Sequence, residues 1–484
     1  MATQKKLLAV VLPLSFRRKL EEAEKLLDFS SVYLVPGRAP VEPRDVDLST
    51  RFSRSVPLNI PIVSSPMDTV TGYEMAVAMA LLGGIGVIHR NMSREEQVST
   101  AKRVKEHPVF PLRRLYVEKS YPCSTSLEIM ASSNTRVLPV VEDSSLEGYV
   151  WAWRLKEICR EGVEPTLLAI DRAGPRYTPR SYRDAVREVL RGSYDAVAIT
   201  ASDSVYLGTI LVQDVLSDYS PATSTDGSLV VAAAVSPYDI DRAILLDKHV
   251  DALVGDIAHF HSTPAIEAAK KLVKNISSDF VAGNIGTYQA VVDLASSLEK
   301  LDGLRVGIAG GSICTTADVG GVYAPTLWAV ASTRDAVEDY GLNIPIIADG
   351  GIRSSGDAVK ALSVGASTVM LGYLLAGTDE ALGDLVVLGD KLYKPYRGMA
   401  SRSALARRYA VDRYSRVSKR VPEGIEGLVE YKGSVYSRLR EFIEGIKAGL
   451  GYAGARNIKE LWEKGKLGLA HRKSLDRVLT SQPA

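Results

Sequence analysis

The sequence predicts an α/β protein built on an eight-stranded (β/α)8 TIM barrel, and three observations lead to this prediction. Short runs rich in Val, Ile and Ala recur along the chain, and a turn and a helical pattern follow each run. Eight such runs can be counted, which is the number that closes a barrel of this kind. Polar residues or glycines follow the runs, where barrel enzymes place their catalytic loops. An open doubly wound sheet is the alternative that the same alternation allows.

The eight candidate strands alternate with helical stretches such as SREEQVSTAKRVKEH and SSGDAVKALSVG, as parallel strands with helical crossovers do. In chain order, we expect the strands at residues 59–67, 83–89, 229–235, 250–257, 279–285, 303–310, 344–351 and 366–372.

More than one hundred residues separate the second and third candidate strands, which is too long for an ordinary crossover. We therefore predict a barrel formed by residues 1–107 and 221–484, with a domain inserted at 108–220. The insert contains two segments that each read as helix, strand, turn, strand, helix. This repeat resembles a divergent pair of CBS modules, also called a Bateman-type domain.

Composition and charge exclude several classes of protein. The 484 residues have a formal net charge of only +2, which argues against a large nucleic-acid-binding surface. No apolar run reaches the roughly 18 residues that span a bilayer, so no membrane partner is expected. The three cysteines, Cys123, Cys159 and Cys314, form no disulfide or metal-binding framework, which indicates a reducing compartment. Arg17 and Arg18 occupy the place of a signal-peptide cleavage site, so we expect a cytoplasmic protein.

Cys314 lies in GGSICTT, directly after the sixth candidate strand. Glycines allow this loop to bend, and the hydroxyls of Ser312, Thr315 and Thr316 could stabilise a thiolate or orient its target, so Cys314 is a candidate nucleophile. The alternative is a small buried cysteine, which is how free cysteines commonly behave. Cys123 and Cys159 lie in the insert and are expected to be structural.

Glycines follow the last three candidate strands, at 310–311, 350–351 and 372. This is the corner where such barrels bind phosphate, because backbone amides without side chains can approach an anion closely. The pattern therefore indicates a phosphorylated ligand, although paired glycines are also common in ordinary turns.

Many motifs occur in one characteristic order. They are DFSSVYLVPGRA, DLSTRFS, LNIPIVSSPMDTVT, GGIGVIHRNMS, GNIGT, GGSICTT, IPIIADGGIRSSGDAVKALSVGAS, LLAGTDE, YRGMAS, VPEGIEG, YKG and GYAGARNIKEL. In these motifs the chain resembles the IMP dehydrogenase and GMP reductase family over nearly its whole length.

The resemblance implies a reaction. Cys314 would attack C2 of inosine monophosphate, and hydride would pass to NAD and leave a covalent thioimidate. Thr316 would assist, and Arg413 and Tyr414 of AVDRYSR would activate the hydrolytic water. The resemblance further implies substrate-binding residues Ser65, Met67, Ser312, Asp349, Gly351, Gly372, Tyr396, Gly398, Met399 and Glu423, cofactor-binding residues Asp256, Asn284 and Arg305, and a monovalent cation, usually potassium (K+), on carbonyls of Ala309, Gly311 and Cys314.

Alternatives remain at this point. A GMP reductase would convert GMP and NADPH to IMP and ammonia, and a divergent purine-nucleotide sensor would lack turnover. Ala317 stands where the family usually has arginine, Tyr373 where a phosphate-binding serine is common, and Ile257 and Ala258 where hydroxyl residues are frequent. The family also implies a homotetramer.

The insert departs from nucleotide-binding CBS modules. Such modules often carry a Thr-x-x-Asp pattern after the second strand, to bind ribose and phosphate. The first repeat has Trp151 and Arg154 there, and the second has Leu211 and Asp214. These departures leave two expectations open for the insert. It binds an adenine or guanine nucleotide, or it has a packing or assembly role instead.

Overall fold

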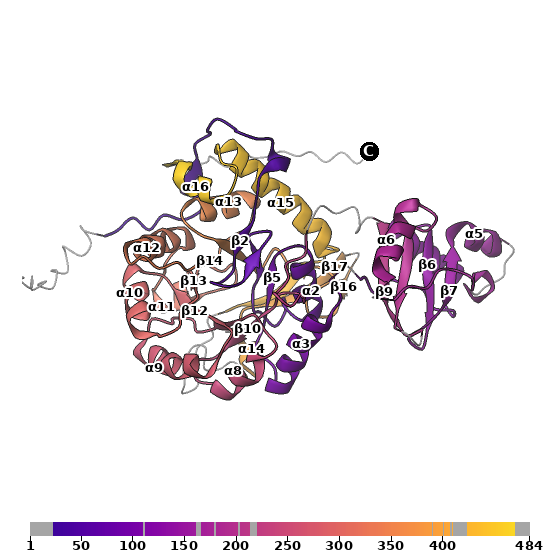
Figure 1. The fold of residues 1–484 in the computed structure, drawn as a ribbon, viewed down its shortest axis with the longest axis horizontal. Helices are drawn as coiled ribbons and strands as arrows, with labels where there is room; N and C mark the ends of the chain where they lie inside the picture. Colours follow the sequence, from indigo (N-terminus) through magenta and orange to yellow (C-terminus); the bar gives the residue numbers. More distant parts are fainter. Residues whose placement is uncertain are drawn as a thin grey trace, which may run out of the picture.

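The computed structural model describes residues 23–109, 112–160, 166–178, 181–201, 204–212, 220–389, 391–399, 401–406, 409 and 424–469. A closed barrel of parallel strands forms the larger part of the molecule (Figure 1). In chain order its strands are β4 (Ile62–Ser64), β5 (Ile85–Ile88), β10 (Ala232–Val235), β11 (Ala252–Gly255), β12 (Asp279–Ile285), β13 (Gly303–Val306), β14 (Ile346–Asp349) and β15 (Thr368–Leu371). All eight predicted strands and the barrel are confirmed, and the open sheet is excluded.

The barrel closes where β5 pairs with β10 and β15 pairs with β4, all in parallel. Residues of β10 and β11 face each other in register, from Ala232 opposite Ala252 to Val235 opposite Gly255. Both strands are fully buried along their length, which explains why they read as continuous apolar runs rather than as alternating patterns.

Helices cover the outside of the barrel. They are α2 (Tyr73–Leu81), α3 (Arg94–Glu106), α8 (Ile240–Asp247), α9 (Thr263–Leu272), α10 (Tyr288–Ser297), α12 (Thr326–Asp339) and α13 (Ser355–Ser363). Side-chain caps define several starts: Ser93 accepts a hydrogen bond from Glu96 N, and Thr287 accepts one from Ala290 N. These caps fix where the helix begins after each strand. They therefore also fix the length of the loops at the strand ends that form the site.

The C-terminal helices α15 (Val435–Tyr452) and α16 (Ile458–Lys464) pack on α13 (Figure 1). Gly449 allows the close approach, because a Cβ there would lie 2.7 Å from a methyl group of Val359. A three-stranded antiparallel sheet of β16 (Val386–Leu388), β17 (Lys391–Arg397) and β18 (Glu426–Glu430) extends from the barrel. Its central strand, β17, carries Tyr396 to the site.

Shorter elements complete the described barrel region. They are the pairs β1 (Val32–Leu34) with β19 (Leu467–Leu469) and β2 (Thr50–Arg51) with β3 (Pro57–Leu58), the helices α11 (Thr316–Gly320) and α14 (Arg402–Ala406), and the 3-10 turns η1 (Pro43–Asp45) and η4 (Val273–Asn275). None of the helices in the described ranges combines the length and the apolarity that crossing a bilayer requires.

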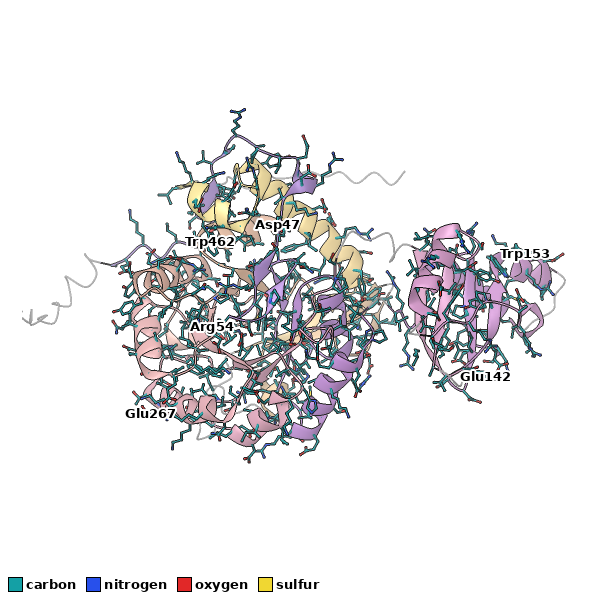
Figure 2. The ribbon with its side chains drawn as sticks, viewed as in Figure 1. Asp47, Arg54, Glu142, Trp153, Glu267 and Trp462 are labelled. Carbon is teal, nitrogen blue, oxygen red and sulfur yellow. The ribbon has the colours of Figure 1, made fainter. Side chains whose placement is uncertain are left out.

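The insert lies beside the barrel and has its own apolar core (Figure 1). Its elements are α4 (Cys123–Ser132), β6 (Val137–Glu142), β7 (Ser145–Trp151), α5 (Ala152–Arg160), η2 (Thr166–Ala169), α6 (Tyr182–Arg191), β8 (Ala196–Thr200) and β9 (Tyr206–Leu211). The first repeat thus shows the predicted order of helix, strand, turn, strand and helix. Trp153 on α5 is 60% exposed and lies on the side of the insert far from the barrel (Figure 2). We propose residues 108–220 as the limits of this domain.

Aromatic side chains fill the space between the two hairpins of the insert. The centroid of the Tyr194 ring lies 5.0 Å from that of Trp151 and 5.3 Å from that of Tyr149. The Tyr149 hydroxyl also accepts a hydrogen bond from Ala198 N, at 2.8 Å. Trp151 therefore contributes to packing at the position where a nucleotide-binding module would have threonine. Asp214 lies outside the described residues.

Candidate functional site

A cavity of about 130 Å³ opens at the carboxyl ends of the barrel strands. The predicted residues that line it are Ser65, Met67, Asn284, Arg305, Ala309, Gly311, Cys314, Thr316, Asp349, Tyr396, Gly398 and Met399. They come from strands β12, β13, β14 and β17 themselves and from the loops that follow β4, β13 and β17. Residues distant in the sequence meet there: the antiparallel strand β17 brings the Tyr396 hydroxyl within 4.0 Å of Met67 Sδ, in the loop after β4 and 329 positions away.

Cys314 is half-buried, and its loop turns beneath the cavity. Ala309 has a left-handed backbone, with φ of +62°, which redirects the chain after β13. The Cys314 amide then donates to Gly311 O at 3.1 Å, and its thiol lies 3.2 Å from Thr316 Oγ1 as a donor. These bonds hold a thiol at the cavity wall, where it can reach a ligand. Cys123, by contrast, is fully buried in the insert, and the side chain of Cys159 lies outside the described residues.

Carboxylates and guanidinium groups alternate from the cavity wall inward, in the order Asp349, Arg305, Asp256 and Arg90. Arg305 Nη1 lies 3.0 Å from Asp256 Oδ1, and Arg305 Nε donates to Asp349 Oδ2 at 2.9 Å. Arg90 contributes the second cation, with Nε 3.3 Å from Asp256 Oδ2. The side chains of Asp256, Arg90 and Arg305 are at most 2% exposed. Buried charges of this kind require paired partners, so the cluster holds the carboxylate of Asp349 at the cavity wall.

Asn284 lines the same cavity and has an acceptor without a hydrogen-bond partner in the described structure. Its Nδ2 donates to Gly307 O at 3.0 Å and to Asp349 Oδ2 at 2.8 Å, and these two acceptors define the orientation of the amide. Asn284 Oδ1 is buried without a hydrogen-bond partner in the described structure. A buried acceptor without a partner is costly, so this oxygen is suited to a donor on a bound ligand.

A smaller cavity of about 60 Å³ adjoins the first and is lined by Ser312, Gly351, Gly372 and Tyr396. We call it the glycine corner. A Cβ on Gly372 would lie 3.1 Å from Met67 Sδ and 3.3 Å from the Tyr396 hydroxyl, so a side chain there would fill the corner. Burial raises the pKa of Tyr396 to about 12, and its hydroxyl therefore stays a neutral donor near pH 7.

The structure brings the described site residues together with one exception, Asp256, and three further predicted residues are not described. Asp256 is fully buried behind the cavity, and both of its carboxylate oxygens face arginine side chains. Arg413, Tyr414 and Glu423 lie outside the described residues. The other residues line one of the two adjoining cavities.

Sequence reasoning missed three residues that organise the site. Arg90 follows β5 by two positions, so the strand-end rule that selected Asp256 would also have selected it. Arg397 Nη2 lies 2.7 Å from Asp68 Oδ2, which ties the end of β17 to the loop after β4. Burial acts to raise the pKa of Asp68, but hydrogen bonds from Arg397 and Asn91 outweigh it and hold that pKa below its usual value. No sequence signal marked this pairing.

A family model described as the IMP dehydrogenase / GMP reductase domain matches residues 26–476 of this chain. The chain belongs to this family. The inosine-5'-monophosphate dehydrogenase of Korarchaeum cryptofilum is 42% identical over 470 residues, which cover 95% of this chain and 97% of that protein. The inosine-5'-monophosphate dehydrogenase of Thermoplasma acidophilum is 40% identical over 97% of this chain and 98% of that protein.

Solved structures of the IMP dehydrogenase / GMP reductase family show the same fold. A cysteine-to-alanine variant of GMP reductase from Trypanosoma brucei, in complex with guanosine 5'-monophosphate, aligns with a TM-score of 0.67 and 32% identity. The alignment covers 93% of this chain and 97% of that one. The family members similar to this chain thus include both dehydrogenases and a reductase. Membership of the family alone therefore does not decide between these two activities.

Proposed function

We propose that this protein is an NAD-dependent IMP dehydrogenase, an oxidoreductase that converts inosine monophosphate and water to xanthosine monophosphate in guanine nucleotide synthesis. The observation that carries the proposal is the half-buried thiol of Cys314 in a cavity that is also lined by the carboxylate of Asp349 and that adjoins the glycine corner. Relatives named inosine-5'-monophosphate dehydrogenase, at 42% and 40% identity, support the choice of substrate.

The Cys314 side chain begins the reaction. Its sulfur, as the thiolate, forms a bond to C2 of the purine, and the hydride of C2 then leaves with its electron pair. This gives a thioimidate on Cys314. Water next attacks C2, the carbon–sulfur bond breaks, and the thiolate and xanthosine monophosphate are released with one proton. Thr316 Oγ1, which accepts from the resting thiol at 3.2 Å, is placed to hold the sulfur during these steps.

The remaining cavity residues bind and orient the nucleotide. The carboxylate of Asp349, held by Arg305, accepts hydrogen bonds from the ribose hydroxyls. The amides of Gly351 and Gly372 and the neutral hydroxyl of Tyr396 donate to the phosphate. Ser65, Met67, Ser312, Gly398 and Met399 complete the wall around ribose, phosphate and base, and Glu423 is assigned to the base from the family resemblance.

Asn284 supports the proposal that a nicotinamide dinucleotide binds here. Its buried and unpaired Oδ1 fits an amide or hydroxyl donor, which the nicotinamide ribose and carboxamide provide. A nicotinamide dinucleotide bound here would supply the acceptor for the hydride that leaves C2. Arg305 lines the cavity together with Asn284. Asp256 acts indirectly, because it pairs with Arg305 and orients it.

The loop of Cys314 fits a monovalent cation such as potassium. The proposed ligands are the carbonyls of Ala309, Gly311 and Cys314, an all-oxygen donor set that suits a hard cation. The Gly311 carbonyl already accepts from Cys314 N at 3.1 Å, but a carbonyl oxygen has a second lone pair. In the described ranges, no group of three His, Cys, Asp or Glu side chains is placed to hold a metal ion.

A steady-state assay tests this function. The full chain is incubated with IMP, NAD and potassium chloride, and the absorbance of NADH is followed. We expect NADH formation in the wild type and its loss in Cys314→Ala, with Cys123→Ala as the control that keeps activity. Absence of NADH in the wild type, with IMP bound, would exclude the dehydrogenase.

GMP reductase is the second candidate, because a solved GMP reductase shares 32% identity and a TM-score of 0.67 with this chain. The same preparation is therefore incubated with GMP and NADPH. Oxidation of NADPH with release of ammonia would assign the reductase. A preparation that neither forms NADH nor oxidises NADPH would favour a purine-nucleotide sensor.

We also propose a cytoplasmic homotetramer. The family resemblance supports the assembly, and Cys123 and Cys314, which form no disulfide, fit a reducing compartment. For the insert, we propose a packing or assembly role rather than binding of an adenine or guanine nucleotide, because Trp151 packs on Tyr194. Sedimentation with and without ATP and GTP tests both points.

A further inference from the structure

The glycine corner has one cationic side chain among its described lining residues, that of Arg353. Arg353 lies between β14 and α13, and its side chain is exposed at the mouth of the corner. No carboxylate of the described chain forms a salt bridge with its guanidinium within 4.0 Å. The guanidinium is therefore available to a ligand.

The backbone amides next to Arg353 are already used. Asp357 Oδ2 accepts from Arg353 N and from Ser354 N, both at 3.1 Å, and Ser354 Oγ accepts from Asp357 N at 3.2 Å. This capping box occupies amides that a helix start could otherwise offer to an anion. It also adds the charge of Asp357 close to the corner, in addition to that of Asp349 in the lining.

The other donors of the corner are neutral. Ser312 and Tyr396 contribute hydroxyls, and Tyr373 replaces the serine that is common at its position. Another cation, Lys432, donates to Tyr373 O at 2.5 Å and lies over the Tyr373 ring at 4.4 Å. Lys432 lines the larger neighbouring cavity and is not among the residues of the corner. A phosphate monoester carries nearly two negative charges at pH 7. Among the described lining residues of the corner, Arg353 is the one that carries a full positive charge to pair with it.

We propose that Arg353 binds the phosphate of the mononucleotide and that its guanidinium makes the corner selective for phosphorylated over unphosphorylated nucleosides. The inference rests on the proposed function in that it takes a purine mononucleotide as the ligand. A planar guanidinium can donate two parallel hydrogen bonds to phosphate oxygens, which a hydroxyl cannot. Arg353 therefore supplies a positive charge, which neither the neutral donors nor the carboxylates around the corner provide.

Calorimetric titration of the full chain with IMP and with inosine tests this assignment. We expect Arg353→Gln to weaken IMP binding about 10- to 100-fold, the range of a charge-assisted hydrogen bond, and to change inosine binding less than about twofold. Arg353→Lys should recover part of the loss, because it keeps the charge without the planar fork. Lys391→Gln removes a distant surface charge as the matched control and should change neither affinity.

The IMP-to-inosine affinity ratio separates the possible outcomes. An equal loss for both ligands in Arg353→Gln would show a merely structural role and would overturn the inference, as would an unchanged IMP affinity. A wild type that binds IMP no more tightly than inosine would also overturn it. A wild type that binds IMP but forms no NADH would refute the proposed dehydrogenase, while the ratio would still decide the role of Arg353.

Discussion

Arg305 contacts Asp349 through two nitrogens, with Nε 2.9 Å and Nη2 2.8 Å from the same oxygen, Oδ2. The third nitrogen of the guanidinium, Nη1, lies 3.0 Å from Asp256. The position of Asp349 at the cavity therefore depends on Asp256, which is not among the residues that line the cavity. Arg90 completes the alternation of charges on the far side of Asp256.

We expect Arg90→Met to destabilise the protein by about 3–5 kcal/mol, because it removes one of the two arginine side chains that pair with the fully buried carboxylate of Asp256. The measurement is the free energy of unfolding from urea titration. Arg94→Met is the control: Arg94 pairs with Asp239 and Asp241 but is 40% exposed, so its loss should cost about 0–1 kcal/mol. Equal effects of the two substitutions would contradict the importance of the buried cluster.

The backbone at Gly307 is expected to tolerate no side chain. Its φ is +135°, and a Cβ would lie 2.1 Å from Asp349 O and 2.8 Å from Thr326 Oγ1. Gly307→Ala should therefore displace the end of β14 and reduce both stability and IMP affinity. Gly227→Ala shares the positive φ, at +83°, but meets no atom within 4 Å, so it isolates the cost of backbone strain, about 1–2 kcal/mol. We expect Gly307→Ala to cost about 1–3 kcal/mol more, and a difference near zero would refute the clash.

The sequence predicted the barrel well because each strand is buried on both sides and reads as one apolar run. The strand-end rule also identified Cys314 and Asp349, since chain direction alone brings those positions to one edge. Pairing across the barrel was not predictable: of the two arginine partners of Asp256, Arg305 lies on β13 and Arg90 in the loop after β5, and nothing local selects this pairing. The sheet of β16 to β18 was missed because its outer strands are largely exposed and lack an apolar period.

Reactivity should distinguish the cysteines. Cys314 is half-buried at a cavity wall, whereas Cys123 is fully buried, so iodoacetamide should alkylate Cys314 first. IMP should slow that alkylation, because the purine would cover the sulfur. Peptide mass spectrometry over time gives the two rates. Rapid labelling of Cys123, or a Cys314 rate that IMP leaves unchanged, would speak against the placement of the thiol beneath the purine.

Lys432 should give the protein an unusual response to alkaline pH. Burial lowers the pKa of Lys432 to about 8, and the charge of Arg438 contributes. In the unfolded chain a lysine keeps its proton to about pH 10.4, so between these values the unfolded state binds more protons. Stability from this group therefore rises as pH increases from 8 to 10. The free energy of unfolding of the wild type minus that of Lys432→Met should increase over this interval.

Lys391→Met is the control for that titration. The hydrogen bond and charge of Glu430 raise the pKa of Lys391, so its folded-state proton is lost at higher pH than the unfolded one. The stability it contributes is present below the unfolded pKa and is lost as pH rises through the folded pKa. The difference between wild type and Lys391→Met should thus stay level from pH 8 to 10, and a parallel rise for both lysines would refute the assignment to Lys432.

The last expectation concerns the step that separates dehydrogenase from reductase. If Arg413 activates the hydrolytic water, Arg413→Ala should still transfer hydride and should then accumulate the thioimidate on Cys314. Rapid mixing with IMP and NAD should therefore show a burst of about one NADH per active site, followed by a steady-state rate reduced about 10²- to 10⁴-fold, the usual contribution of an acid–base group. Arg416→Ala, in the same basic segment, should retain the full steady-state rate. A normal steady-state rate in Arg413→Ala would show that another group activates water, while loss of the burst itself would place Arg413 before the hydride step.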